Sequence, residues 1–308
     1  MNKSQKEVLQ TYLNDEKAVL KRLESNYTSA LADVKRNIKQ LMSSDLTQSK
    51  AYQLEYQKQL EKQIQGCLDN LQGKNFSTIS EYMNQSYYNG YLGTMYDIHK
   101  QGIPLILPID QNQVVKACQK TGDDIKLSKK LGGNVDELKK QTLAELQRGL
   151  STNMTYSDIA RNISNYGESD MNRSYRIART EGHRIQNEAK MDCLHSAQEN
   201  GADVVKQWDS TLDDNTRETH QKLDGQIREI DEDFEVDGLS APCPGQFGDP
   251  AEDCNCRCAM LQRARWALDE DELSTLKERA EYFGLDKTDS FEDFKNKYMN
   301  ISNEEIKH

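Results

Sequence analysis

The sequence has few apolar residues and no long apolar run. Hydrophobic residues make up 35% of the 308 positions and aromatic residues 7%, whereas charged residues reach 30%. This balance argues against one large core and favours a modest core with extended helices. No run approaches the roughly 20 apolar residues of a membrane-spanning helix. Residues 1–5 lack the apolar segment of a signal peptide, so we expect synthesis and folding in the cytoplasm.

Positive charge is also scarce. The formal net charge of -11 argues against bulk electrostatic binding to nucleic acid, which needs clustered Lys and Arg. One local basic face remains, formed by Arg173, Arg176, Arg179, His183 and Arg184.

The cysteines cannot form a fully paired disulfide framework within one chain, because there are seven of them. Cys67 and Cys118 stand alone in helical-looking sequence, which is typical of small core residues. A second group, Cys243, Cys254, Cys256 and Cys258, is concentrated near the end of the chain.

The first part of the sequence predicts two long helices. Residues 2–42 contain no Pro or Gly, and an apolar residue recurs every seven positions at Leu13, Leu20, Tyr27, Val34 and Leu41. Leu23, Ala30 and Ile38 lie close to the intervening heptad positions, and the whole pattern is typical of a coiled-coil seam. A break at residues 43–45 precedes a second helix that we expect to end at Gly73, with Leu54, Leu60, Ile64, Leu68 and Leu71 on one stripe.

The middle of the chain predicts further helices. The Tyr- and Gly-rich residues 74–110 fit helix packing or an adaptable contact surface. Helices are expected at 111–118, 136–150, 155–163 and 171–199, with 116–130 irregular. Gly132-Gly133 is interpreted as a hinge, Gly167 as a helix end, and Asn200-Gly201 as the stop of the last helix.

After Gly201 the apolar pattern changes to that of strands. Strands are predicted at 204–208 and 256–261, a short helix at 216–223 with Gly225 after its end, and a hairpin of 227–230 with 234–236. Residues 237–253 are expected to be loop, and 273–298 an acidic, solvated helix. The predicted fold class is α+β. The predicted regions are a helical arm (1–73), a helical connection (74–150), a small C-terminal α+β domain (151–265) and an acidic tail (266–308).

A histidine and two cysteines form the first candidate site. Cys256 and Cys258 lie two apart on a predicted strand, so both thiols face one side, and His220 lies on the short helix. Three interpretations remain open: structural zinc with a fourth ligand from Cys254, Cys243 or Asp224, a disulfide, or metal-free packing with His220 hydrogen-bonded internally.

Two polar groups form the other candidates. Asp209, Asp213, Asp214 and Asp224 surround His220 in sequence and would suit acid–base chemistry, although residues 213–216 are more simply a turn and helix cap. On the helix 171–199, Glu181 and Arg184 are spaced to form an ion pair. That polar face is either solvated or docked onto the small domain, where Arg179, Glu181 and Arg184 would pair with Asp209 or Asp214.

Taken in order, these residues resemble a known family. The series runs from Ala178-Arg179-Thr180-Glu181 through Trp208 and the acidic turn to Thr216-Arg217, His220, Leu223-Asp224-Gly225, Pro244-Gly245 and Asn255-Cys256-Arg257-Cys258. It is similar to the C-terminal domain of phage minor head proteins, the Mu F-like head morphogenesis family. The resemblance covers roughly residues 150–265. Cys243 and Cys254 are not part of the family's pattern.

The resemblance implies a low-copy virion component that forms in the host cytoplasm and then lies in the capsid interior. Its implied partners are the portal protein, the major capsid or scaffolding protein and phage DNA, which some such proteins accompany on ejection. No catalytic residue is assigned. The motif residues are Arg179, Thr180, Glu181, Arg184, Trp208, Asp209, Asp214, Arg217, His220, Asp224, Gly225, Asn255 and Arg257. The alternative is a metal-dependent hydrolase or nuclease that uses His220, Asp224, Cys256 and Cys258.

Overall fold

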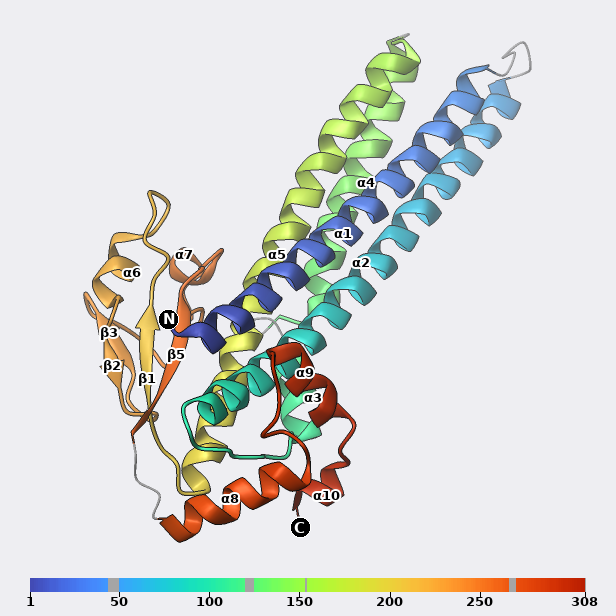
Figure 1. Cartoon of the computed structure of the whole chain (residues 1–308). Helices are drawn as coiled ribbons and strands as arrows, with labels where there is room; N and C mark the ends of the chain where they lie inside the picture. The colour runs from blue at the N-terminus through green and yellow to red at the C-terminus, as the bar shows by residue number, and fades with distance from the viewer. Residues whose placement is uncertain (44–49, 120–124, 153, 266–269, 308) are drawn as a thin grey trace. The chain divides into compact units, whose positions relative to one another are not determined.

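The computed structural model describes residues 1–43, 50–119, 125–152, 154–265 and 270–307. Its helices and strands are, in order, α1 (Lys3–Ser43), α2 (Lys50–Lys100), α3 (Gln111–Gln119), α4 (Leu127–Ser151), α5 (Tyr156–Glu199), β1 (Asp203–Asp209), α6 (Glu218–Leu223), β2 (Ile227–Arg228), β3 (Phe234–Val236), β4 (Leu239–Ala241), α7 (Pro250–Asp253), β5 (Ala259–Arg265), α8 (Glu270–Tyr282), α9 (Phe291–Met299) and α10 (Asn303–Lys307) (Figure 1). The predicted α+β class is confirmed.

The chain forms two compact units. The first, here called the sheet unit, comprises Met1–Glu16, Tyr82–Asp124 and Arg179–His308; the second, the helical unit, comprises Lys17–Glu81 and Ile125–Ala178. Each unit therefore combines segments that are far apart in sequence. The division at residues 73, 150 and 265 stays a prediction.

The helical unit has a core contributed by four helices, whose segments lie side by side in Figure 1. Tyr27 and Val34 of α1 are buried there, as the seven-residue repeat predicts, together with Leu60, Ile64, Leu68 and Leu71 of α2. The repeat does not extend to Leu13, which is 51% exposed. The buried stripe on α1 follows a spacing of three and four residues, through Val19, Leu23, Tyr27, Ala30, Val34 and Ile38. It therefore includes Leu23, Ala30 and Ile38, which the sequence places close to the intervening heptad positions. The side chains of Leu41 and Leu54 lie outside the described residues.

Glycine predicts helix boundaries wrongly at three places in this unit. α2 continues through Gly73, α4 through Gly132-Gly133 and α5 through Gly167. One glycine costs a helix only about 1 kcal/mol, which packing readily offsets. At Gly167 the small residue is itself required for packing, because an added Cβ would lie 2.5 Å from a Leu31 methyl carbon.

The Tyr- and Gly-rich segment lies in α2 up to Lys100, and from Tyr82 onward it packs inside the sheet unit. Tyr87, Tyr91 and Tyr96 are at most 2% exposed, which confirms the interpretation as helix packing. The acidic tail is not a solvated appendage, as the sequence suggested. Phe291 and Phe294 of α9 are buried, and their rings lie 5.6 and 5.4 Å from that of Tyr96. Aromatic burial thus outweighs the acidic composition of this region.

The sheet has the strand order β2-β1-β5, and all its pairings are antiparallel. β1 confirms the predicted strand at 204–208, and Gly201 ends α5 with φ of 86° as expected. The predicted hairpin of 227–230 with 234–236 is wrong: β2 pairs with β1, whereas β3 pairs with β4. Between β3 and β4, Asp237 and Gly238 both have positive φ, as a two-residue hairpin turn requires. The predicted strand at 256–261 is shifted, since β5 begins at Ala259.

A buried carboxylate joins three segments of the sheet unit. Asp97 of α2 is fully buried and accepts hydrogen bonds from five neutral side chains: Asn2, Ser4, Gln5, Gln101 and Gln262. Gln262 lies in the middle of β5. The start of α1, the end of α2 and β5 are therefore tied to one charge.

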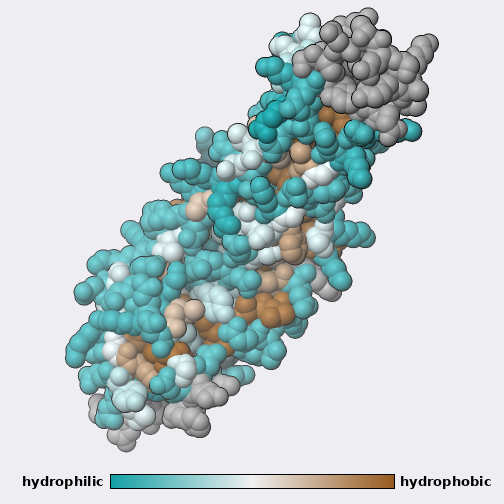
Figure 2. All heavy atoms as spheres, turned by 90° about the vertical axis from the view of Figure 1, so that its right-hand side faces the viewer, coloured by the Kyte–Doolittle hydropathy of each residue, from teal (hydrophilic) through white to brown (hydrophobic). Residues whose placement is uncertain are grey.

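The surface is mostly polar. Figure 2 shows hydrophilic residues over most of the face in view, with hydrophobic residues in smaller groups. No helix in the described ranges combines the length and hydropathy that crossing a membrane requires.

Two glycines of α2 should respond oppositely to alanine. Gly73→Ala meets nothing within 4 Å and should stabilise the protein by about 0.5–1 kcal/mol, because glycine loses more backbone entropy on folding. Gly90→Ala places Cβ 2.4 Å from the Gln186 backbone oxygen and should destabilise by about 1–3 kcal/mol. Denaturant unfolding of the full chain measures both. Equal effects would contradict the close approach at Gly90.

Burial of His99 should make stability fall with acid. Desolvation, followed by Lys100, lowers the pKa of His99 from 6.5 to about 4. The unfolded chain therefore takes up a proton at a higher pH than the folded chain. The free energy of unfolding is therefore unaffected by His99 above about pH 6.5 and falls as the pH drops towards 4. The total fall is about 3 kcal/mol, at roughly 1.4 kcal/mol for each unit by which the pKa is shifted. Unfolding of His99→Phe should show a flatter pH profile. Parallel profiles for the two proteins would contradict this.

Candidate metal centre

The candidate site lies beside a small core in the sheet unit. Trp208 of β1 is fully buried, and its ring makes edge contacts with Phe234 at 5.2 Å and with His220 at 5.8 Å. The core cluster consists of Trp208, Leu223, Phe234, Val236, Cys256 and Cys258, with Leu239 and Phe247 packed against it. Two of the six buried residues are thus cysteines, which leaves little apolar area to hold the segments together.

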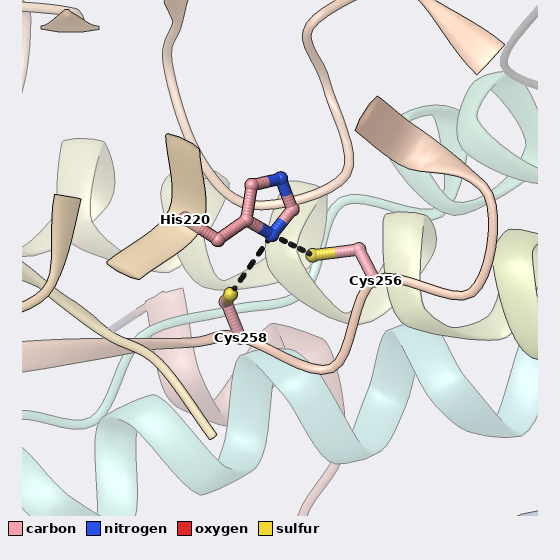
Figure 3. Close-up of side chains that lie close together, drawn as sticks. All are labelled: His220, Cys256 and Cys258. Atoms are coloured by element: carbon pink, nitrogen blue, oxygen red, sulfur yellow. Dashed lines mark hydrogen bonds between the residues drawn. The ribbon is translucent and has the colours of Figure 1, made fainter. Parts of the chain in front are cut away.

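His220, Cys256 and Cys258 converge on one point (Figure 3). His220 Nδ1 lies 3.3 Å from Cys258 Sγ and 3.8 Å from Cys256 Sγ. The three side chains are 2%, 6% and 2% exposed. The structure brings together the three residues that the sequence singled out, although the two cysteines precede β5 instead of lying in the predicted strand.

The two thiols differ in acidity. A hydrogen bond from Cys256 lowers the pKa of the Cys258 thiol, with further help from His220 and the Ser210 hydroxyl. The same pairing, together with burial, raises the pKa of Cys256. One thiolate next to an imidazole is therefore favoured even without an ion, and a thiolate is the form that binds metal.

A glutamate that the sequence did not single out lies behind the imidazole. Glu252 Oε2 is 3.0 Å from His220 Nε2, off the line of a hydrogen bond. Thr219 donates a 2.9 Å hydrogen bond to the same oxygen. In metal sites a carboxylate often orients the histidine from its far nitrogen. Asp249 caps α7 and Pro250 opens it; this Asp-Pro pair is the sequence signal that places Glu252 on a short helix.

The predicted fourth ligands lie elsewhere. Among the described residues, the group of possible ligands contains only His220, Cys256 and Cys258. Asp224 accepts a 2.8 Å hydrogen bond from the Ser210 backbone N–H. Burial raises the pKa of Cys243 to about 12, which keeps it a thiol.

The acidic turn is organised by an arginine. Arg257 donates to both oxygens of Asp213, at 2.5 and 2.6 Å. This hydrogen bonding lowers the pKa of Asp213. Arg217 donates to the Cys254 carbonyl at 2.7 Å, and Gly225 has φ of 79° after the end of α6. Residues 213–216 form the predicted turn, in which the Asp213 carboxylate accepts from the Asn215 N–H and the Thr216 hydroxyl. The predicted helix cap is wrong, because the N-cap of α6 is Arg217, which makes no side-chain capping hydrogen bond.

The polar face of α5 docks onto the loops of this site, though not through the ion pairs predicted. Arg184 pairs with Glu181 at 2.9 Å and Glu188 at 2.5 Å on its own helix, and Arg179 pairs with Glu16. The predicted pair of Glu181 with Arg184 is confirmed. The predicted pairing with Asp209 or Asp214 is wrong, because Arg184 has acids one turn away on α5 and Arg179 has Glu16 of α1.

Neutral groups make the contacts between α5 and the site. The Thr180 hydroxyl accepts from the Asn255 N–H at 3.2 Å, and His183 Nε2 lies 2.7 Å from the Cys258 carbonyl oxygen. Asn187 donates to the Pro244 carbonyl at 3.0 Å. Asn255 has a positive φ of 55°, a conformation that asparagine tolerates.

Together these features define an α+β protein in which a long helix is joined by polar contacts to a small sheet domain with a buried His-Cys-Cys cluster. Residues 140–261 match the family Phage Mu protein F like protein, so this stretch is a Mu F-like domain. The recognition made from the sequence is confirmed.

Two characterised relatives are similar over most of the chain. The minor head protein GP7 of Bacillus phage SPP1 is 29% identical over 253 residues, covering 78% of this chain and 80% of GP7. The NAD(+)--arginine ADP-ribosyltransferase EFV of Enterococcus faecalis is 31% identical over 266 residues, covering 85% of this chain but 55% of that protein. The chain thus spans about half the length of this second relative. No solved structure matches the chain.

The Arg184–Glu181 ion pair should contribute far more to stability than the Arg179–Glu16 ion pair. Glu181 is 1% and Arg184 11% exposed, so Arg184→Ala leaves a buried carboxylate without its arginine and should cost about 3–5 kcal/mol. Arg179→Ala is the matched control on the same helix. Its pair with Glu16 is 46% and 34% exposed, so the cost should be about 0–1 kcal/mol. Thermal and denaturant unfolding give both values. Similar losses would show that burial of the pair does not matter.

Proposed function

We propose that this chain is a minor head protein of a phage, a low-copy virion component associated with the portal and the capsid interior. The observation that carries the proposal is the similarity to GP7, which extends over 78% of this chain and 80% of GP7. A shared short domain would leave most of one protein unmatched. Here the match reaches well beyond residues 140–261, the range of the family domain.

The contacts around the candidate site support a structural role. Asp224 and Asp213, two of the acids grouped with His220 in sequence, are engaged by the Ser210 backbone and by Arg257. His220 faces two thiols and Glu252. Polar side chains here hold loops in place, and we propose that the protein acts without catalytic turnover.

The proposed partners are the portal protein and the major capsid or scaffolding protein. Phage DNA is a weaker candidate, because the net charge is -11. The predicted basic face offers little charge for DNA, because Arg179 is paired with Glu16 and the largely buried Arg184 with Glu181 and Glu188; any DNA affinity would fall steeply with salt. The chain would be present in the host cytoplasm during assembly and then in the head.

Procapsids made with and without the portal protein test the proposal. We expect quantitative mass spectrometry to find this chain at low copy number in complete procapsids and to find it lost from portal-less ones. Deleting its gene should lower infectivity or assembly fidelity while DNA replication stays normal. Equal amounts in both kinds of particle would contradict association with the portal.

Enzymatic alternatives are tested on the purified full-length chain. The name of the Enterococcus relative makes ADP-ribosyl transfer from NAD+ to arginine one reaction to assay, and the metal-dependent hydrolase alternative adds DNA, peptide and nucleotide cleavage. We expect no activity in any assay. Turnover that disappears in His220→Ala would overturn the non-enzymatic proposal. Zinc should be supplied, so that an empty site does not produce a false negative.

A further inference from the structure

We propose that His220, Cys256 and Cys258 bind one zinc ion, with a water molecule as fourth ligand, and that the ion is a structural cross-link between α6 and the segment before β5. Nothing in the family match or in the names of the relatives assigns a metal to this chain. The proposal rests on how three donor atoms from two separate segments are placed.

The distances between the donors are those of a tetrahedral zinc site. Zinc–sulfur bonds of about 2.3 Å and zinc–nitrogen bonds of about 2.0–2.1 Å put the nitrogen and sulfur roughly 3.6 Å apart at a tetrahedral angle. The observed separations from His220 Nδ1 are 3.3 Å to Cys258 Sγ and 3.8 Å to Cys256 Sγ. All three donor atoms lie within 4.8 Å of one another. The side chains therefore need almost no movement to accept an ion.

The chemistry of the donors selects the metal. Two thiolates and an imidazole suit zinc and disfavour calcium, magnesium and manganese, which prefer oxygen ligands. Glu252 Oε2 lies 3.0 Å from Nε2, and a small rotation of either side chain would let it accept a hydrogen bond from the Nε2–H of a histidine that binds the ion through Nδ1. In a disulfide of Cys256 with Cys258, neither the imidazole nor Glu252 would have such a role.

The fourth position faces a small polar recess. Its lining includes His220 and Cys258 themselves, with Thr211, Asn215, Thr216, Arg217, Asn255 and Arg257 around them. Since the described residues offer no further ligand within the group, solvent in this recess supplies the remaining bond. An open fourth position is the pattern of catalytic zinc, whereas structural zinc usually has four protein ligands. The structural role is therefore assigned from the burial of all three ligands and the small size of the recess, and the hydrolysis assays with zinc supplied test it.

A zinc ion at this site would supplement the small apolar core around Trp208. His220 lies on α6, whereas both cysteines lie 36 or more residues further along the chain. An ion bound to all three residues would hold α6 and the segment before β5 together beside Trp208. Structural zinc contributes directly to folding in domains with little apolar core.

Metal analysis of the full-length protein tests the site. The protein is prepared with reductant and without a histidine tag, incubated with equimolar zinc, and dialysed. We expect one zinc per chain, and loss of the metal in Cys256→Ser and Cys258→Ser. Cys254→Ser is the matched control, because it makes the same change in the same Cys-x-Cys-x-Cys run outside the cluster. It should keep the metal. Zinc-free wild-type protein, or loss of zinc from Cys254→Ser, would overturn the proposal.

Cobalt substitution keeps the test decisive if a cysteine variant fails to fold. Cobalt(II) in the wild-type protein should show thiolate-to-metal charge transfer and the intense visible bands of a tetrahedral site. Glu252→Gln should bind zinc with unchanged stoichiometry but about 10–100-fold more weakly, because the imidazole is less well oriented. Zinc should also raise the melting temperature of the wild-type protein. An octahedral cobalt spectrum, or a Cys256–Cys258 disulfide in the reduced preparation, would overturn the proposal.

Discussion

The buried carboxylate of Asp97 is the interaction on which the sheet unit depends. A charge without solvent is costly unless hydrogen bonds replace the water, and Asp97 receives them from Asn2, Ser4 and Gln5 at the start of α1, from Gln101, and from Gln262 of β5. Hydrogen bonds to a charged group contribute about 1.5–3 kcal/mol each. β5 pairs with β1 along its whole length, so the position of Asp97 also fixes the strand that follows the His-Cys-Cys cluster.

None of this is visible in the sequence, where Asp97 looks like any polar helix residue. The sequence predicted well the features that depend on neighbouring residues alone. These are the stop of α5 at Gly201, the strand β1 and the short helix α6 before Gly225. They failed where tertiary packing decides. Gly167 looked like a helix end, but the residue is small because Leu31 lies against it. The pairing of β3 with β4 depends on a turn at Asp237-Gly238 that the acidic residues 231–233 obscured.

The candidate site was more predictable than the fold around it. Two cysteines separated by one residue place their thiols on the same side in any extended segment, so it mattered little that they precede β5. The charged contacts were not predictable in the same way. Arg184 has acids three and four residues away on its own helix, and these outcompete partners that would have to come from another segment. Glu252 was missed because the residues 237–253 gave no sign that their last turn faces His220.

The segment that contains Cys256 and Cys258 is held from both sides. This suggests why the His-Cys-Cys cluster and the polar residues of α5 occur together in the ordered series of motif residues in the sequence. From one side, His220 of α6 contacts the thiols of Cys256 and Cys258. From the other, α5 holds the backbone of the same segment through Thr180 and His183. Either set of contacts alone would leave a short, irregular segment with a positive-φ residue, Asn255, free to move. Because the core beside it is small, polar contacts contribute much of the order of this segment, and removing the cluster should loosen residues 256–258 while β5 stays paired with β1.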